Sequence, residues 1–424
     1  MRRRRFLVRA AGLSGAGALA LSGCGSGGDG EGDAVTLEVL LAGYDGTVGT
    51  SIEKRWNAAV RAFEKKHPAI TVKVERVPFL KLDATLARRV KDGRAPDISE
   101  GNFFAPYAEE GRLYSADDLF DVPVQANFIN SFADAGKVDS VQYGLPTQAS
   151  APRLFYNTAL FRQAGLTGAP TSWAGLRSCA QALRGIGVAT PYALTFGPEA
   201  AEDELLAWLL AGDGGYASLS GYDFATVENV ATLTWLRDKL VVPGLAGADP
   251  AKLTRTQAYA EFLRGRAGML LAHPVLLPAA GQAGLKVATA PFPKRDGDGA
   301  APPVGLNDWL MAFRQNGRLA AARTFLTFLF TSPAARTYGS DTGTLPATVS
   351  DSDELQEDPS MRALWPFAHE LPDAEFHPVG LRSWATVRSA VRQRIGEAVA
   401  PGGNPAHVLE ALDQVGSSAL RSSA

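Results

Sequence analysis

A strand, helix and strand near the start of the chain limit most strongly what it can fold into. The apolar run 35–41 has the length of a buried strand, and residues 70–74 alternate between apolar and polar. Between them, apolar residues recur from Trp56 at i, i+3, i+4 and i+7, and His67-Pro68 ends this helical pattern. Because a helix that crosses over between two strands is the βαβ unit of α/β proteins, an α/β architecture is expected.

The same alternation continues along the chain. A helix is expected around residues 80–91, followed by another short strand. Ser172 is a candidate N-cap for a helix over residues 173–183, and Pro405 opens a closing amphipathic helix.

Length and charge restrict the number of domains and the kind of partner. The chain has 424 residues, 46% of them hydrophobic, which is more than one core usually covers, so two domains are expected. Its formal net charge of −2 becomes −7 when the five arginines of the first 23 residues are excluded. A mildly acidic chain lacks the basic surface that nucleic-acid binding needs, so no nucleic-acid partner is expected.

Residues 1–23 have the organisation of a secretory signal peptide. A cluster of arginines is followed by the apolar stretch 10–21, which is too short to span roughly 30 Å of hydrocarbon as a helix. Leu21-Ser22-Gly23-Cys24 resembles the bacterial lipobox, in which the cysteine receives a diacylglyceryl group and becomes the first residue of the mature protein. Segment 24–33 is then a lipid-anchored flexible tether. The expected location is the outer face of the cytoplasmic membrane, reached by either Sec or twin-arginine export.

Signatures of catalysis are largely absent. The sequence has no His-Glu-x-x-His motif and no phosphate loop, and its five histidines lack metal-ligand spacing, so no metal and no cofactor are expected. Carboxylates such as Glu202 and Glu204 could serve a glycosidase as acid and base, but nothing fixes their separation. The second of the two cysteines, Cys179, is expected to be a buried core thiol. An exported α/β chain without a catalytic constellation points to capture of a ligand.

Eight sequence blocks in order carry a resemblance to one family. Two examples are Tyr107-Ala-Glu-Glu-Gly-Arg-Leu113 and Tyr156-Asn157 within 154–161. The blocks are 56–68 with 70–74, 92–98 with 107–113, 143–146 with 154–166, 170–173, 211–216, 262–269, 290–293 and 343–346. From about Val35 to Val415 the chain resembles the extracellular solute-binding proteins of ABC importers, specifically the sugar-binding group of the maltose-binding type.

The resemblance implies a type II fold of two α/β lobes, joined by crossing hinge segments, with the ligand held between them. The first lobe would comprise 34–146 plus 290–331, and the second 147–289 plus 332–424. Closure of the lobes around a sugar would create the shape that the transmembrane subunits of an ABC permease recognise. The protein is expected to be a monomer and not an enzyme.

Trp384 and Arg388 are the first candidates for ligand contact. The block 383–391 is similar to a maltose-type segment in which a Trp and an Arg one helical turn apart meet the sugar, and the i, i+4 spacing places both on one helix face. An aromatic ring can stack on the C–H face of a sugar while polar groups bind its hydroxyls. The alternative is a core Trp beside a surface Arg.

Further candidates come from loops, from the first crossing segment with Gln148 and Ser150, and from other positions that the resemblance places at the cleft; for Gln148 and Ser150 the alternative is capping of the backbone. A simple N-cap role is the alternative for Asn102, and Glu204 and His273 stand where relatives carry aromatic residues. These candidates are Tyr44, Asp45, Glu100, Asn102, Gln148, Ser150, Glu202, Glu204, His273, Asn307 and Asp308.

Three readings of the function follow. A receptor for a mono- or disaccharide is favoured, since few aromatic side chains remain for stacking once Trp56 and Trp173 are assigned to the core. The second reading keeps the fold but places a cationic solute, such as a polyamine or amino sugar, on Glu100, Glu202 and Glu204. The third is an exported lipid-anchored glycoside hydrolase.

Overall fold

The structure is a computed structural model that describes residues 34–44, 46–218, 221–295 and 299–423. The signal peptide, the tether with Cys24, and the site candidate Asp45 lie outside the described residues. Within these ranges no helix is both long and apolar enough to cross a membrane.

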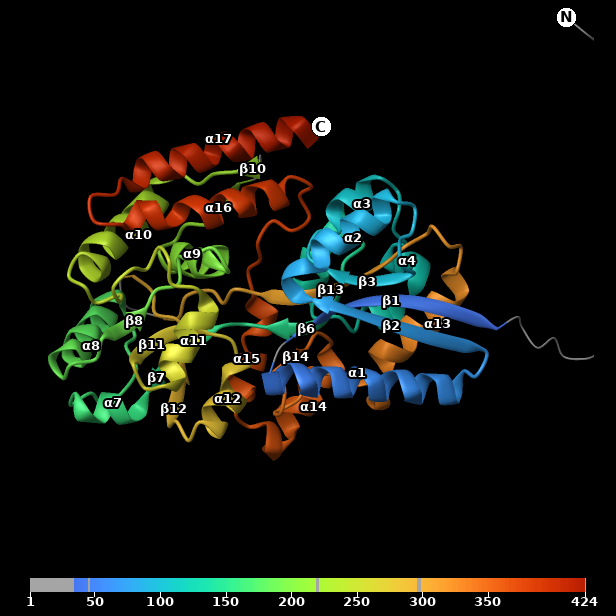
Figure 1. Ribbon diagram of the computed structural model, residues 1–424, viewed down its shortest axis with the longest axis horizontal. Coiled ribbons are helices and arrows are strands. Elements are labelled where there is room, and N and C mark those ends of the chain that lie inside the picture. The colour runs from blue at the N-terminus through green and yellow to red at the C-terminus, as the bar shows by residue number, and fades with distance from the viewer. Residues whose placement is uncertain (1–33, 45, 219–220, 296–298, 424) are drawn as a thin grey trace, which may run out of the picture.

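Two lobes, each built around a sheet, lie side by side (Figure 1). The first sheet has six strands in the order β14-β6-β13-β3-β1-β2, and the second has four in the order β12-β7-β11-β8. The strands of the first sheet are β1 (Val35–Gly43), β2 (Ile70–Pro78), β3 (Ile98–Gly101), β6 (Leu145–Ser150), β13 (Leu306–Ala312) and β14 (Leu345–Pro346). Those of the second are β7 (Arg153–Asn157), β8 (Thr190–Ala193), β11 (Ala267–Ala272) and β12 (Val287–Ala290).

The predicted βαβ unit is confirmed. β1 and β2 pair in parallel from Val35 opposite Ile70, and α1 (Gly46–Lys66) connects them. Helix α1 buries Trp56 and Phe63 in the core of the first lobe, as the helical spacing predicted. The next helix, α2 (Leu82–Lys91), leads to β3, which pairs with β1 in parallel.

The helices of the first lobe cover its sheet. Besides α1 and α2 they are α3 (Ala105–Glu109), α4 (Ala116–Leu119), α5 (Val122–Gln125), α6 (Asn130–Ala135) and α13 (Leu319–Thr331). The small two-stranded ribbon β4 (Lys137–Val138) and β5 (Val141–Gln142) follows α6.

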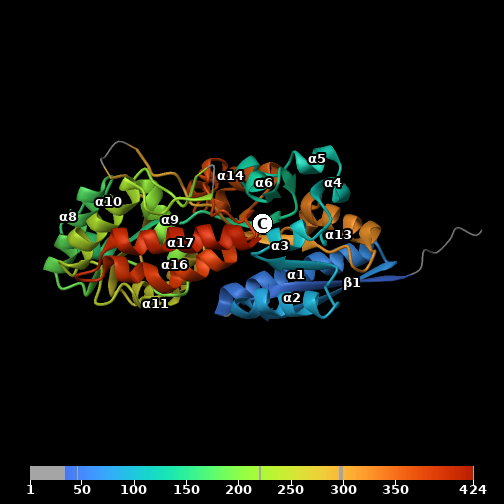
Figure 2. The same cartoon turned by 90° about the horizontal axis from the view of Figure 1, so that it is seen from above.

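The second lobe is mostly helical around its smaller sheet. Ser172 caps α8 by accepting a hydrogen bond from the Gly175 N–H at 3.1 Å, as predicted, and Cys179 is buried in the core of this lobe. Helices α16 and α17 pack together along its upper side in Figure 1 and face the viewer in Figure 2. The helices are α7 (Thr158–Gln163), α8 (Trp173–Gly185), α9 (Ala201–Ala211), α10 (Val227–Leu236), α11 (Arg255–Leu263), α12 (Leu276–Gln282), α16 (Trp384–Val399) and α17 (Pro405–Ser423), with the strand pair β9 (Ala217–Ser218) and β10 (Gly221–Tyr222).

The chain crosses between the sheets at several points. Strand β6 of the first sheet is followed after two residues by β7 of the second, and β12 returns through 291–305 to β13. The segments at these crossings share an apolar cluster. It contains Ala149 of β6, Phe155 of β7 and Phe367 of α15 (Trp365–Ala368). Helix α15 follows α14 (Val349–Glu357). Strand β14, from the range predicted for the second lobe, pairs with β6 of the first sheet. The predicted lobe boundaries stay a prediction.

Candidate ligand-binding site

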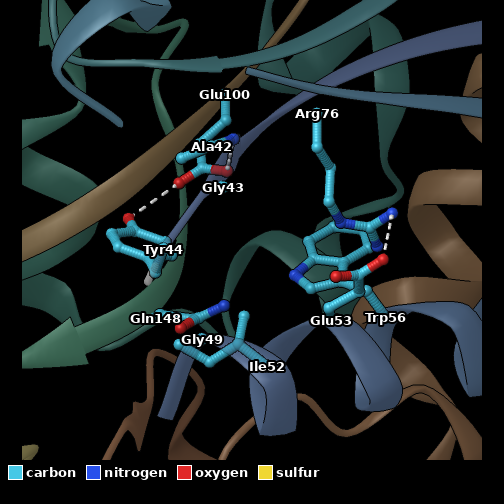
Figure 3. Close-up of a pocket in the computed structure, with 10 residues that line it drawn as sticks. All are labelled: Ala42, Gly43, Tyr44, Gly49, Ile52, Glu53, Trp56, Arg76, Glu100 and Gln148. Atoms are coloured by element: carbon cyan, nitrogen blue, oxygen red, sulfur yellow. Dashed lines mark hydrogen bonds and ion pairs between the residues drawn. The ribbon is translucent and has the colours of Figure 1, made fainter. Parts of the chain in front are cut away.

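Four neighbouring segments of the first sheet place polar side chains in a row. Gln148 lies on β6, Asp308 opposite it on β13, Glu100 on β3, and Tyr44 directly after β1. The Tyr44 hydroxyl is 3.0 Å from Asp308 Oδ2 and 3.3 Å from Glu100 Oε1. The Ala42 N–H donates to Glu100 Oε2 at 2.9 Å, which fixes that carboxylate at the end of β1 (Figure 3). We call Gln148, Asp308, Glu100 and Tyr44 the polar row.

A small pocket of about 30 Å³ opens beside the polar row and is lined by Tyr44, Glu100 and Gln148 (Figure 3). Its other side is formed by α1, including Glu53 and Trp56. The side chain of Gln148 is 6% exposed, and its Oε1 atom has no hydrogen-bond partner in the described part of the chain. An unpaired buried polar atom is costly, so this oxygen is a candidate ligand contact.

Burial raises the pKa of both carboxyl groups in the row. The pKa of Glu100 rises to about 8, through burial and then the nearby charge of Asp308. Burial also raises the pKa of Asp308 to about 6, although the hydrogen bond from Tyr44 opposes the shift. The pair therefore holds a proton near neutral pH, because two unscreened carboxylates this close cannot both ionise without compensation.

The acids of the second lobe, in contrast, are already engaged. Glu202 forms a two-pronged ion pair with Arg392, with Nε 2.7 Å from Oε2. Glu204 accepts hydrogen bonds from the side chains of Tyr192, Thr195 and Trp208 at 2.6, 3.0 and 2.9 Å. Neither carboxylate is free to act as the acid or base of a glycosidase.

Burial raises the pKa of Glu204 to about 7, against the effect of its three donors. The adjacent Asp203 shows the opposite result. Although burial raises its pKa, the hydrogen bond with His377 and the charges of His377 and Arg255 lower it to about 2. Asp203 therefore carries a negative charge that this lobe compensates internally.

Trp384 and Arg388 share one helix face, as predicted, but their surroundings differ. Trp384 is 2% exposed, stacks on His377 with centroids 5.2 Å apart, and packs against Tyr216. The Arg388 guanidinium lies 4.2 Å from the centroid of the Phe103 ring, and its Nη2 is 3.7 Å from Asp83 Oδ2. Because Phe103 and Asp83 belong to the first lobe, Arg388 connects the two lobes.

The remaining candidates lie on either side of the same boundary. The Ser150 hydroxyl is 2.8 Å from His273 Nδ1, which joins the end of β6 to the end of β11. Burial and the Arg255 charge lower the pKa of His273 to about 3, so its ring is neutral. Asn307 accepts a hydrogen bond from the Thr147 N–H at 3.1 Å and so supports the β6–β13 pairing. The neighbouring candidate, Asp308, is the residue whose carboxylate contacts the Tyr44 hydroxyl.

For Asn102 the alternative N-cap role is wrong. Helix α3 is preceded by Phe104, and both the backbone N–H and the side-chain amide of Asn102 donate to Asp83, at 3.0 and 3.4 Å. Asn102 therefore orients the carboxylate that meets Arg388.

Several residues at the boundary and in the ion pairs of the second lobe were not predicted from the sequence. These are Asp83, Phe103, Asp203, Arg255, His377 and Arg392. The one available signal was local: Asp203 lies between two acids that were predicted, and Arg392 is one turn beyond Arg388 on α16.

Comparison with known proteins now places this architecture. A family model described as bacterial extracellular solute-binding protein matches residues 48–336. The chain belongs to this family. It is accordingly a solute-binding protein and not an enzyme, as predicted.

Relatives with long coverage agree. A protein of Brucella abortus (strain 2308), described only as a binding protein, is 24% identical over 371 residues, covering 86% of this chain and 89% of the relative. The crystal structure of the cyclic alpha-maltosyl-1,6-maltose binding protein from Arthrobacter globiformis has a TM-score of 0.77 at 20% identity, and the match covers 91% of this chain and 99% of that one. An ABC transporter solute-binding protein from Thermotoga lettingae, bound to α-D-tagatose, has a TM-score of 0.73 at 17% identity, covering 92% and 100%. These likenesses confirm the predicted fold class.

Proposed function

We propose that this solute-binding protein is an exported lipoprotein that captures a small carbohydrate by hinge closure and delivers it to the transmembrane subunits of an ABC permease. The two structural neighbours described above bind an oligosaccharide and a monosaccharide, and one of them serves an ABC transporter. The lipid on Cys24 would keep the receptor at the membrane surface, which raises its effective concentration near the permease.

The observation that carries the proposal is that polar groups of both lobes meet at one boundary. Arg388 of α16 contacts Phe103 and Asp83 of the first lobe, and His273 contacts Ser150. Contacts that exist only when the lobes are together favour the closed state, and a ligand that adds further contacts to both lobes shifts the equilibrium toward closure.

The dimensions of the site favour a small ligand. The cavity beside the polar row is about 30 Å³, which is room for about two water molecules, so in this structure it admits a small polar group and not a whole sugar ring. Trp384 and Trp309 are both 2% exposed, so extended aromatic platforms for a long glycan are scarce around it. We propose the polar row as the contacts of the first lobe, and Arg388 and His273 as those of the second.

Calorimetric titration with a panel of neutral and amino mono- and disaccharides tests the proposal. Saturable binding, accompanied by a smaller radius of gyration in X-ray scattering, is the expected result. Turnover of the bound compound, or the absence of binding across the panel, would refute it.

A further inference from the structure

The polar row presents acceptor atoms without a cation. In the second lobe and the hinge, by contrast, the acids Glu202, Asp203 and Glu370 each pair with an arginine or a histidine. Within the described ranges, Glu100 and Asp308 form no ion pair; they are hydrogen-bonded to each other, and their other contacts are the Tyr44 hydroxyl and the Ala42 N–H. Burying two carboxylates this way is costly unless a positive charge joins them.

The nearest cations are engaged elsewhere. Arg255 acts on Asp308 only at a distance and lies 3.5 Å from Asp203 Oδ2. Arg76, which lines the pocket, donates to Asn57 at 3.0 Å and lies 3.7 Å from Glu53. Neither arginine forms an ion pair with the row, although the charge of Arg76 acts on Glu100 and that of Arg255 on Asp308, and Asp83 adds a further negative charge near Glu100.

Gln148 supplies an independent indication that a donor belongs here. Its Oε1 atom is buried, has no partner among the described residues, and belongs to a side chain that lines the same pocket as Glu100 (Figure 3). In the β6–β13 pairing, Gln148 is directly opposite Asp308, so the two side chains point to the same face of the sheet. Gln148 and Glu100 thus present acceptor oxygens to one pocket, and Asp308 adds a second carboxylate, hydrogen-bonded to Glu100.

We propose that the ligand carries an ammonium group, as an amino sugar does, and that this group binds among Glu100, Asp308 and Gln148. An ammonium has three donors and no acceptor, which matches three acceptor side chains. A sugar hydroxyl donates only one proton and brings no charge, so it would leave the carboxylate pair uncompensated in a closed cleft. The sugar part of the ligand rests on the proposed function, whereas the ammonium group is inferred from the polar row alone.

Binding of the ammonium would also change the protonation of the row. The free pair retains a proton near neutral pH, and the positive charge of the ligand lowers the pKa of the pair, so protons pass to the buffer when the ammonium binds. A neutral sugar would release none. Heat measured in buffers of different ionisation enthalpy separates the two cases.

The test is a titration of the full-length protein with glucosamine and galactosamine, each beside its neutral parent sugar and its N-acetylated form, and with putrescine. The amino sugars should bind at least about tenfold more tightly than the other two forms, as expected for hydrogen bonds to a charged group. Glu100→Gln and Asp308→Asn should abolish this preference and the proton release. Glu204→Gln is the matched control, since it changes a buried acid that lies outside the row and outside the pocket.

The outcomes separate the inference from the proposed function. If neutral and amino sugars bind equally and Glu100→Gln changes neither, the ammonium site is refuted while the sugar receptor stands. If putrescine alone binds, and Glu100→Gln abolishes it, the ammonium site is supported and the carbohydrate function is refuted. Circular dichroism of each variant identifies any loss of binding caused by unfolding.

Discussion

Removing the aromatic ring that faces Arg388 should weaken closure of the lobes. Phe103→Leu keeps an apolar side chain at the boundary but removes the ring that lies 4.2 Å from the guanidinium. A cation–π contact of this kind is worth about 0.5–2 kcal/mol, more when water is excluded, and Arg388 is 21% exposed at its side chain. If the closed form is the minor one without ligand, the dissociation constant should rise about 2- to 30-fold.

Titration calorimetry gives the dissociation constant, and X-ray scattering with saturating ligand shows whether the closed form is still reached. A double-mutant cycle with Arg388→Ala isolates the coupling between ring and guanidinium from the other effects of each change. Arg382→Ala is the control, because its pairs with Glu109 and Glu110 lie on the more exposed rim of the same boundary and should contribute little. A coupling energy near zero, with unchanged affinity in Phe103→Leu, would refute the idea that this contact holds the lobes together.

Three further predictions concern stability and location. Trp384→Ala should lower the free energy of unfolding by about 3–5 kcal/mol, because the ring is buried against His377 and Tyr216; urea denaturation measures it, and a loss below about 1 kcal/mol would contradict the packing. The pKa of Glu204 is raised on folding, so its contribution to stability is largest at low pH and decreases as pH rises toward about 7; Glu204→Gln should flatten that part of the pH profile, and an unchanged slope in denaturation series would count against it. Cys24→Ser should leave ligand binding intact but release the protein from membranes in cell fractionation, whereas continued membrane association would rule out the lipid tether.

The strands and helices that hold the site could be predicted from the sequence better than the contacts between its side chains. The order of strand and helix around β1 and β2 followed from periodicity alone. Tyr44, directly after β1, and Glu100, near the end of the parallel neighbour β3, come together as expected for the carboxyl ends of such strands, although the sequence predicted a loop at Glu100. The role of Glu202 was different, because its partner Arg392 is 190 residues away and no local pattern indicates the pairing. Helical spacing likewise placed Trp384 and Arg388 on one face but could not show that one is enclosed by its own lobe while the other reaches across.

The boundary between the lobes has two unlike edges. The apolar cluster shared by β6, β7 and α15 forms one edge, and the ion pairs of Arg382 and Arg388 form the other. In Figure 1, α14 and α15, which contribute to the apolar cluster, lie at the lower side, whereas α3 and α16, which carry Glu109 and Arg388, lie at the upper side. Dispersion and the hydrophobic effect hold the first edge, and mostly charge holds the second. Since added salt screens exposed ion pairs and leaves apolar contacts in place, ionic strength should loosen the lobes at one edge only. The salinity of the surroundings would thus adjust how readily the receptor opens, without approaching the conditions that unfold it.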